Sequence, residues 1–434
     1  MLNYLRKLIP DTHPIRLFYH KVMSTMAAIA YWFPADKMIV IGVTGTNGKT
    51  TVTNLTTNIL IEAGHKVGMI STINFQIGAK KWVNTTKQTT FGAFKLQKIL
   101  REMVREDCKY LVLEVSSHAI TQSRLIGVNV DIGVVTNITP DHVEYHGGFN
   151  NYLDAKGGLF EKVVNGKPKF GVSKTLISNQ DDKYFTFFNQ FDAERKMSYG
   201  FDDATLHVSG LEGDLSGSRF ILHLPDGEMP VNFKMPGDYN VYNALAASSV
   251  AAALQVPLGT IRDGLEKSDS VSGRFEHVNC GQEFDVVVDY AHAPESLEAL
   301  LEMYKERTPG RLFAVFGATG GGRDKGKRPR MGEVADKHAD YIVLTDDDPY
   351  EEDEWEIIEN IAPGIKRNEG RDFWKIPDRR EAIRLALTMA GKGDTVVVAG
   401  KGCEEVMKLR GKTIEWNDRK VIEELLERKV KINL

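Results

Sequence analysis

The sequence VIGVTGTNGKTTVTN, residues 40–54, contains the signals that indicate what kind of domain this chain forms. Its first half is an apolar, β-branched run, which is typical of a buried strand. Its second half is a glycine-rich loop that ends in Gly48, Lys49 and Thr50 and leads into a helical pattern. A strand, a loop and a helix in this order place backbone N–H groups and a lysine ammonium around an anion. The stretch therefore predicts a phosphate-binding loop.

The loop departs from the usual pattern, G-x-x-x-x-G-K-[ST], because Val43 stands where the first glycine belongs. We interpret the remaining unit, residues 45–51, as a variant of the phosphate loop rather than a tight turn, since Gly-Lys-Thr-Thr is hard to explain by packing. Lys49 is expected to bind phosphate oxygens, and the hydroxyl of Thr50 is expected to bind Mg²⁺.

Other apolar runs also end in polar clusters. Continuous runs of this kind predict parallel strands covered by helices on both faces, and ligands bind at the carboxyl ends of such strands. The runs are MIVIGV (38–43), YLVLEV (110–115, followed by Ser116-Ser117-His118) and DIGVVTNI (131–138, followed by Thr139-Pro140-Asp141-His142). The expected fold class is α/β, with a mostly parallel sheet in a central P-loop-like domain.

The remaining chain predicts an insertion and a second domain. Residues 165–235 contain short alternating runs and many turn residues, which favour an antiparallel insertion or an edge of the central domain. Four further strand-and-loop patterns, FDVVVDYAH, RLFAVFGATGGG, YIVLTDDDP and DTVVVAGKG, predict a Rossmann-like α/β domain. We expect a short N-terminal helical segment at 1–37, a central nucleotide-binding domain at 38–272 and a C-terminal domain at 273–434.

Composition excludes several classes of protein. The 434 residues are too many for one compact core, and the net charge of −4 argues against a nucleic-acid partner. Three widely spaced cysteines, Cys108, Cys280 and Cys403, indicate a reducing compartment, with neither a disulfide framework nor a thiolate zinc site. A cytoplasmic location is the expectation.

The N-terminal segment has no cleavage-site pattern, so a secretory signal is not expected. Its apolar run, residues 22–33, is too short to span a bilayer core of about 30 Å. We favour a helix packed on the first domain. Because Arg6, Lys7, Arg16 and Lys21 precede the run, an interfacial membrane helix stays the alternative.

Several other side chains could bind a metal ion or take part in catalysis, and the residues alone leave these roles open. Glu114 and the pair Asp141-His142 follow different strands and could hold a divalent ion near the phosphates. No G-x-S-x-G elbow surrounds residues 116–118, so a hydrolase triad is not favoured. Lys156, taken alone, is typical of a solvated helical charge.

Two loops of the second domain are strongly charged. GGGRDKGKRPRMG suggests an anion site or a mobile surface loop. TDDDPYEEDEWEIIE suggests a site for an amine-bearing ligand or a solvated acidic helix start.

Eleven motifs occur in an order that points to one family. They are GVTGTNGKTT, LEVSSHA, TNITPDHVEYHG, LDAKGGLF, PGDYNVYNALAA, SGRFE, DYAHAPESLE, GATGGGRDKGKRPRMGEVA, TDDDP, AGKGCEE and NDR. From residue 38 to 434 the chain resembles the Mur ligases, ATP-dependent amide-bond ligases of peptidoglycan synthesis, and in particular those that add the third stem-peptide residue. The resemblance implies that ATP phosphorylates a muramoyl-peptide carboxylate to an acyl phosphate, which the amine of an amino acid then attacks.

The resemblance also implies roles for individual residues. The catalytic set would be Lys49, Glu114, His142 and Lys156. Mg²⁺ would be held by Thr50, Glu114 and His142, together with Lys156 as a carbamate. ATP would contact Gly45, Thr46, Asn47, Gly48, Lys49, Thr50, Thr51, Asn240, Asn243, Arg274, Asp289 and His292. The acceptor would contact Asn84, Thr85, Thr86, Ser116, Gln122 and Arg124, and the amino acid would contact Arg323, Asp347, Asp348, Gly400 and Glu404.

The amino-acid pocket departs from the family pattern. Diaminopimelate-adding members carry Asp-Asn-Pro-Arg, whereas this chain has Asp347-Asp348-Pro349-Tyr350, without the arginine that would pair with a distal carboxylate. A basic amino acid such as lysine or ornithine fits this charge pattern better, and diaminopimelate stays the alternative. Cys403 replaces the histidine usual in Lys-Gly-His-Glu.

Few residues precede the phosphate loop, so the family's uridine-binding domain is expected to be missing. The acceptor could then be UDP-linked, lipid-linked or on another carrier. A folylpolyglutamate-synthase-like ligase and a non-catalytic nucleotide-binding partner protein are further alternatives, the latter disfavoured by the complete catalytic set. We expect a monomer without a nucleic-acid partner; weak contact of the N-terminal helix with a membrane surface is the additional possibility.

Overall fold

The chain divides into two compact units, residues 1–269 and 270–434, which are described separately. The computed structural model describes residues 12–84, 89–140, 143–214, 216–268, 273–322 and 325–432. Both units are built around a mostly parallel sheet, so the expected α/β class is confirmed.

The first unit contains an eight-stranded sheet in the order β4-β3-β2-β5-β1-β6-β7-β8. Only the β2–β3 and β3–β4 pairs are antiparallel. The strands are β1 (Ile39–Thr44), β2 (Val67–Ile70), β3 (Asn74–Ile77), β4 (Lys80–Val83), β5 (Tyr110–Glu114), β6 (Ile132–Val135), β7 (Thr175–Asn179) and β8 (Arg195–Tyr199).

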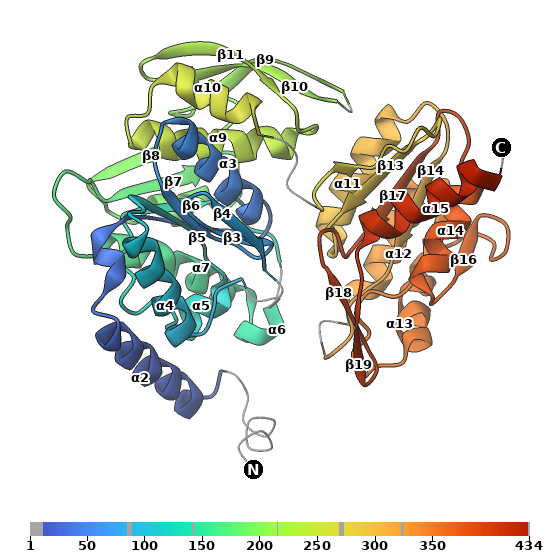
Figure 1. Cartoon of the computed structure of the whole chain (residues 1–434), viewed down its shortest axis with the longest axis horizontal. Coiled ribbons are helices and arrows are strands. Elements are labelled where there is room, and N and C mark those ends of the chain that lie inside the picture. Colours follow the sequence, from blue (N-terminus) through green and yellow to red (C-terminus); the bar gives the residue numbers. More distant parts are fainter. Residues whose placement is uncertain are drawn as a thin grey trace. The chain divides into compact units, whose positions relative to one another are not determined.

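Helices cover both faces of this sheet, which explains why its central strands are continuous apolar runs (Figure 1). On one face lie α4 (Ala93–Arg105) and α7 (Phe149–Val164), whose apolar stripes join the core with β1 and β5. On the other face lie α3 (Lys49–Glu62) and α9 (Asp238–Ala253). Shorter helices complete the unit: α5 (Ser117–Thr121), α6 (Val143–His146), α8 (Phe185–Asn189) and α10 (Leu258–Glu266).

Strand register gathers polar residues at one edge of the sheet. Strand β1 pairs in parallel with β5, and Val43 lies opposite Glu114. The phosphate-like loop after β1 and the carboxylate at the end of β5 therefore share the carboxyl edge, where α/β proteins bind ligands.

The segment 165–235 is only partly antiparallel. Strands β7 and β8 join the main sheet in parallel at its edge, which agrees with the second alternative, an edge of the central domain. A separate antiparallel sheet follows, made of β9 (His207–Asp214), β10 (Gly217–Leu224) and β11 (Gly227–Phe233).

The N-terminal helix α2 (Pro14–Ala30) begins earlier than its apolar run suggested and packs beside α4. Its buried residues are the small Ser24, Ala27 and Ala28. A 3₁₀ turn, η1 (Pro34–Lys37), connects it to β1. No helix among the described residues is long and apolar enough to cross a membrane.

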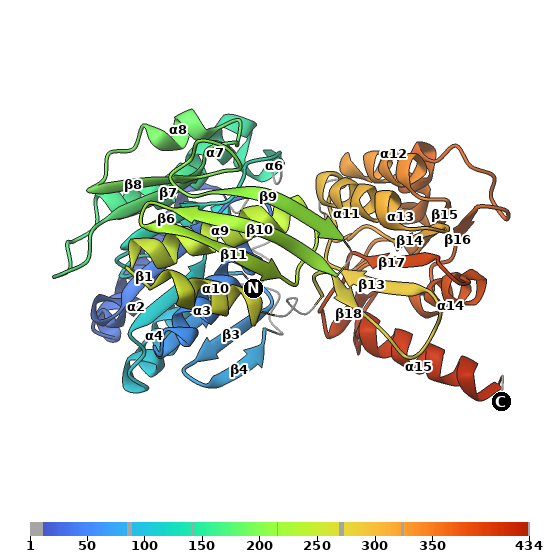
Figure 2. The same cartoon turned by 90° about the horizontal axis from the view of Figure 1, so that it is seen from above.

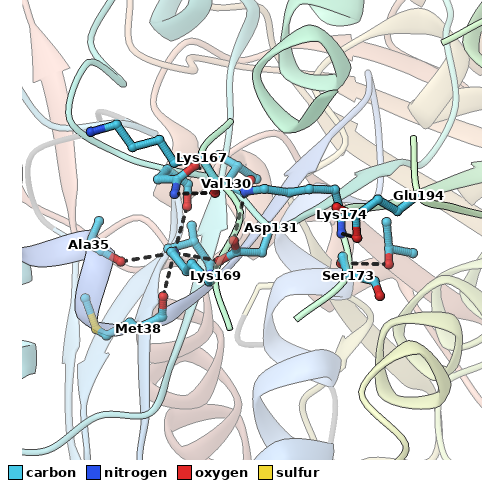
Figure 3. Close-up of polar contacts among 12 residues, drawn as sticks. Ala35, Met38, Val130, Asp131, Lys167, Lys169, Ser173, Lys174 and Glu194 are labelled. Carbon is cyan, nitrogen blue, oxygen red and sulfur yellow. Dashed lines mark hydrogen bonds and ion pairs between the residues drawn. The ribbon is translucent and has the colours of Figure 1, made fainter. Parts of the chain in front are cut away.

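A buried cluster around Asp131 fixes the entry into β1 (Figure 3). Asp131 accepts hydrogen bonds from Lys169 Nζ at 2.7 Å, from Lys174 Nζ at 3.0 Å and from Val40 N at 2.8 Å. The Lys169 ammonium also donates to the carbonyl oxygens of Ala35 and Met38, so it ties η1 to the sheet.

Replacing Asp131 by alanine is expected to destabilise the first unit by about 3–5 kcal/mol, because two buried ammonium groups lose their carboxylate. Hydrogen exchange followed by mass spectrometry should show lost protection in β1 and β6. Glu298→Ala, which removes an exposed ion pair with Lys337, is the control and should cost less than about 1 kcal/mol. Equal, small effects of both changes would contradict a structural role of the cluster.

The second unit contains a six-stranded sheet in the order β12-β13-β17-β14-β15-β16, in which only β12 is antiparallel. Its strands are β12 (Glu276–His277), β13 (Asp285–Asp289), β14 (Leu312–Phe316), β15 (Tyr341–Leu344), β16 (Phe373–Lys375) and β17 (Thr395–Ala399). The four strands expected from the sequence are present, and β12 and β16 are additional. A hairpin of β18 (Val406–Leu409) and β19 (Lys412–Glu415) follows.

Helices also sandwich this sheet (Figure 2). On one face α14 (Arg379–Met389) and α15 (Asp418–Ile432) pack on β13, β14 and β17. The other helical elements are α11 (Pro294–Arg307), α12 (Lys327–His338), α13 (Glu354–Ile361) and the turn η2 (Ala362–Gly364). Cys108, Cys280 and Cys403 are free thiols, as expected.

Candidate active site

The loop after β1 turns directly into α3. Gly48 caps this helix in the left-handed conformation, with φ of 81°, which suits glycine. A Cβ at Gly48 would collide with Asn243 Oδ1 on α9, so a side chain is excluded there. The N–H groups of the first turn of α3 have no carbonyl partner within the helix and can face an anion.

The loop is braced by the segment after β6. Asn137 accepts from Thr46 N through its carbonyl oxygen at 2.8 Å and from Asn47 N through Oδ1 at 3.0 Å. Thr136 Oγ1 donates to Asn47 O at 2.6 Å. Lys49 Nζ donates to Thr46 O at 2.7 Å, which holds the ammonium beside the loop. The loop is thus preorganised by groups outside it.

Glu114 is buried next to the start of α3, with 2% of its surface exposed. Its Oε2 accepts from Thr50 Oγ1 at 2.9 Å and from Thr72 N at 2.7 Å, and its Oε1 accepts from Thr72 Oγ1 at 2.8 Å. Because Thr50 donates its only hydroxyl proton to Glu114, the lone pairs of its oxygen remain available for a cation.

Lys156 is not the solvated charge that helical lysines usually are. It lies on α7 with 3% of its surface exposed, and its Nζ donates to Gly45 O at 2.5 Å. The ammonium lies 5.3 Å from the ring centroid of Tyr152, whose hydroxyl is 2.7 Å from Thr46 Oγ1. Helix α7 therefore contacts the phosphate-like loop at two points.

The expected acceptor residues fall into two groups. Gln122 and Arg124 are joined, since Arg124 donates to Gln122 Oε1 from Nε at 2.9 Å and from Nη2 at 2.6 Å. Gln122 Nε2 donates to Tyr145 OH at 2.9 Å. Ser116 caps α5, whereas Asn84 is anchored separately through Nδ2 to Ser71 O at 3.0 Å.

Four expected site residues, Thr85, Thr86, His142 and Arg323, lie outside the described residues.

The expected ATP residues belong to both units. In the first unit, Asn243 adjoins Gly48, and its Nδ2 donates to Asn240 Oδ1 at 3.2 Å.

In the second unit, Asp289 is buried at the end of β13 and accepts from Phe275 N and Ala291 N at 2.9 and 2.7 Å. Burial raises the pKa of Asp289, and the neighbouring Arg274 offsets only part of this increase. Arg274 stacks on Tyr290, with 4.7 Å from the guanidinium carbon to the ring centroid. His292 Nδ1 lies 2.8 Å from Tyr290 O.

Four of the five expected amino-acid residues, Asp347, Asp348, Gly400 and Glu404, lie together in the second unit. Carboxylate oxygens of Asp347, Asp348 and Glu404 lie within 4.8 Å of one another. Lys401 Nζ donates to Asp348 Oδ1 at 2.9 Å and to Glu404 Oε2 at 2.5 Å. Three carboxylates thus gather around the Lys401 ammonium, which makes the cluster strongly acidic.

Asp347 is the least compensated member of this cluster. Its Oδ2 has no hydrogen-bond partner among the described residues. Burial raises the pKa of Asp347, while Lys401 and Arg379 lower it. A Cβ at Gly400 would come within 2.6 Å of Asp347 Oδ2, so this approach requires glycine.

Two neighbouring groups titrate unusually. Burial, reinforced by Glu354, raises the pKa of Asp346 to about 7. Burial also raises the pKa of Cys403 to about 12, so its thiol stays protonated at neutral pH and is unsuited to nucleophilic attack.

Sequence reasoning missed four residues that position the site: Thr72, Asn137, Tyr152 and Lys401. Asn137 and Lys401 lie inside motifs already recognised, TNITPDH and AGKGCEE, and were passed over because their partners are distant in sequence. Thr72 carried no signal at all.

A phosphate-like loop with a buried carboxylate and lysine beside it is typical of a nucleotide-binding enzyme. Two family models match the chain: the Mur ligase middle domain at residues 43–251 and the Mur ligase glutamate ligase domain at residues 273–402. The chain belongs to the Mur ligase family and is an ATP-dependent, amide-forming ligase, as the sequence predicted.

Two relatives with high similarity to this chain share one name. The chain is 40% identical over 423 residues to the UDP-N-acetylmuramoyl-L-alanyl-D-glutamate–2,6-diaminopimelate ligase of Syntrophomonas wolfei, covering 97% of this chain and 83% of the relative. A ligase of the same name from Caldanaerobacter subterraneus is also 40% identical, over 93% of this chain and 81% of the relative. A solved structure of a ligase of that name is 30% identical, with a TM-score of 0.62 over 91% of this chain and 79% of the other.

Folylpolyglutamate synthase of Mycobacterium tuberculosis, solved with ADP and AMPPCP, has a TM-score of 0.69 at 16% identity, over 87% of this chain and 92% of the other. At that identity the likeness shows the fold alone, so it does not favour the folylpolyglutamate alternative.

Proposed function

We propose that the chain joins an amino acid to a muramoyl dipeptide at the third position of the peptidoglycan stem peptide, consuming ATP. The observation that carries this proposal is the group of buried side chains around the phosphate-like loop: Glu114 bonded to Thr50, and Lys156 bonded to Gly45. The substrates are taken from the printed names of the relatives.

The reaction would proceed in two steps. A carboxylate oxygen of the acceptor attacks the γ-phosphorus of ATP, which forms an acyl phosphate and releases ADP. The neutral amine of the amino acid then attacks the acyl carbon, the amide forms, and inorganic phosphate leaves with the C–O bond electrons while the amine loses a proton. Lys49 and the N–H groups of α3 would neutralise the phosphate oxygens in the first step.

The site suits Mg²⁺, because hard carboxylate and hydroxyl oxygens gather beside the loop. We infer that Thr50 and Glu114 hold the ion, together with His142. When bound, Mg²⁺ would neutralise charge on the phosphate oxygens. The residues themselves orient one another: Thr72 fixes both oxygens of Glu114, and Glu114 fixes the hydroxyl of Thr50.

We infer that Lys156 acts as a carbamate. The neutral amine adds CO₂, which forms an N–C bond and releases one proton. The product carries a negative charge and keeps one N–H, which can still donate to Gly45 O. Its near-complete burial beside the loop supports this role better than that of a solvated cation.

We place the acceptor peptide near Gln122, Arg124, Ser116 and Asn84, together with Thr85 and Thr86. The guanidinium of Arg124 is a suitable partner for a carboxylate of the dipeptide. For the carrier we propose the UDP-linked dipeptide of the relatives' names. Phosphate release with UDP-linked and lipid-linked dipeptides tests this choice, and faster turnover of the lipid-linked form would reverse it.

We propose that a basic amino acid is the incoming substrate. Asp347 Oδ2 is buried without a hydrogen-bond partner among the described residues, the carboxylates of Asp348 and Glu404 lie beside it, and Tyr350 offers no cation for a distal carboxylate. Arg323 would pair with the α-carboxylate, and Gly400 leaves room beside Asp347.

Lysine or ornithine is therefore expected to give about tenfold or higher kcat/KM than diaminopimelate, since an unpaired buried carboxylate is costly. Amine-dependent phosphate release with the three amino acids measures this. Preference for diaminopimelate would contradict the amino-acid assignment but not the ligase reaction. Absence of amine-dependent ATP hydrolysis with every acceptor would contradict the ligase reaction itself.

We further expect a monomer in solution and a weak contact of α2 with a membrane surface. Sedimentation velocity tests the first expectation.

A further inference from the structure

The N-terminal helix α2 exposes large apolar side chains along its whole length. In Figure 1 it lies at the periphery of the first unit. The exposed fractions range from 39% for Val22 to 68% for Phe18. The full set is Ile15, Phe18, Tyr19, Val22, Met26 and Ile29.

These six side chains form one face. At about 100° per residue they fall within an arc of about 100°. The buried residues, Ser24, Ala27 and Ala28, lie on the opposite side of the helix. An ordinary surface helix buries its large apolar residues and exposes small or polar ones. Helix α2 does the reverse, so its apolar face needs a partner.

Two aromatic residues are exposed directly after the helix. Trp32 is 81% exposed and Phe33 is 41% exposed. Both adopt the left-handed conformation, with φ of 57° and 46°, which large side chains rarely adopt. The turn keeps both rings at the surface instead of folding them into the core.

A second segment with an exposed aromatic residue lies near the end of α2. Phe170, the residue after Lys169, is fully exposed, and Lys169 is bonded to the carbonyl oxygens of Ala35 and Met38 next to the end of α2 (Figure 3). A cavity of about 390 Å³ is lined by Phe33 and by charged residues of both signs, Asp36, Glu161, Lys162 and Lys167. The end of α2 and the segment 162–170 are therefore neighbours.

The charge of this region differs from that of the chain as a whole. Helix α2 contains no acidic residue, and Arg16 and Lys21 lie on the two flanks of its apolar face. Lys37 follows the helix, and Asp36 is the only acidic residue between positions 12 and 37. The full chain, in contrast, has a net charge of −4. The apolar face is thus bordered by positive charge.

We propose that the apolar face of α2 binds the surface of an anionic lipid bilayer. An apolar face with basic flanks and aromatic residues at its end matches the interfacial region, where the face enters the acyl boundary and the cations meet lipid phosphates. This goes beyond the ligase reaction and specifies the surface contact expected of α2. It does not depend on which acceptor or amino acid the enzyme uses.

Co-sedimentation of the full chain with lipid vesicles tests the proposal. Vesicles of phosphatidylcholine containing phosphatidylglycerol should bind the chain about tenfold more tightly than phosphatidylcholine alone, because Arg16 and Lys21 flank the face. The double variant Phe18→Asp with Ile29→Asp should lose binding by about tenfold or more. Ile221→Asp changes an exposed isoleucine on β10 and should bind as the unchanged chain does.

Far-ultraviolet circular dichroism and a thermal unfolding curve show whether each variant is folded, and this control does not depend on the ligase reaction. A second double variant, Phe18→Ser with Ile29→Ser, should also lose binding, without added charge. The proposal is overturned if the unchanged chain stays in the supernatant with both vesicle types. Unaltered binding of the double variants overturns it as well. A dimer in solution that the variants dissociate, with no vesicle binding, would assign the face to a second copy of the chain.

Discussion

Glu114→Gln is expected to lower kcat by about 10²–10³-fold, because loss of the carboxylate charge removes several kcal/mol of stabilisation at the phosphate-facing site. The variant should fold normally. Glutamine has nearly the shape of glutamate, one of its polar atoms can still accept from Thr50 and Thr72 N, and its amide can donate to Thr72 Oγ1. ATP-dependent amide formation, measured over a range of Mg²⁺ concentrations, should show a higher Mg²⁺ requirement.

Glu194→Gln is the matched control, since Glu194 also accepts a backbone N–H, from Lys174 at 3.1 Å, but lies outside the proposed site. Its activity and Mg²⁺ requirement should be unchanged. If Glu114→Gln keeps full activity at low Mg²⁺, Glu114 holds the loop in place and does not bind the ion.

Lys156→Met is expected to abolish ligation by about 10³-fold or more, because the variant has neither a cation nor an amine that can become a carbamate. Methionine nearly fills the buried volume of the lysine stem, so α7 should keep its stability. Lys162→Met on the same helix is the control, since Lys162 is half-buried and has no proposed role. Its activity should stay within a few-fold of the unchanged enzyme.

Carbamylation makes a separate prediction. Removal of dissolved CO₂ should slow the unchanged enzyme, and bicarbonate should restore it. With ¹³C-labelled bicarbonate, a carbamate resonance should appear in the unchanged chain and be absent from Lys156→Met. If activity does not depend on CO₂ and no carbamate resonance appears, Lys156 is not carbamylated. Its role would then be the hydrogen bond to Gly45 O.

Much of the fold and the chemistry could be predicted from local sequence. Continuous apolar runs predict buried parallel strands, because only such strands are covered on both faces, and Gly48-Lys49-Thr50 after one of them predicts a phosphate loop. The order of the motifs was enough to indicate the family and its ATP-dependent reaction.

Other features depend on contacts between distant segments, and no local pattern encodes these. Lys156 is one helical lysine among many until α7 packs against the loop and brings its Nζ to Gly45 O, 111 positions away. Asn137 and Lys401 likewise have roles only because strand register and loop packing bring their hydrogen-bond partners, Asn47 and Asp348, close to them. The outward apolar face of α2 is a further case, because periodicity reveals a stripe but not which side of a helix is packed. Sequence determines which groups are available, and three-dimensional packing selects those that meet, because burial and hydrogen bonding act between residues far apart in the chain.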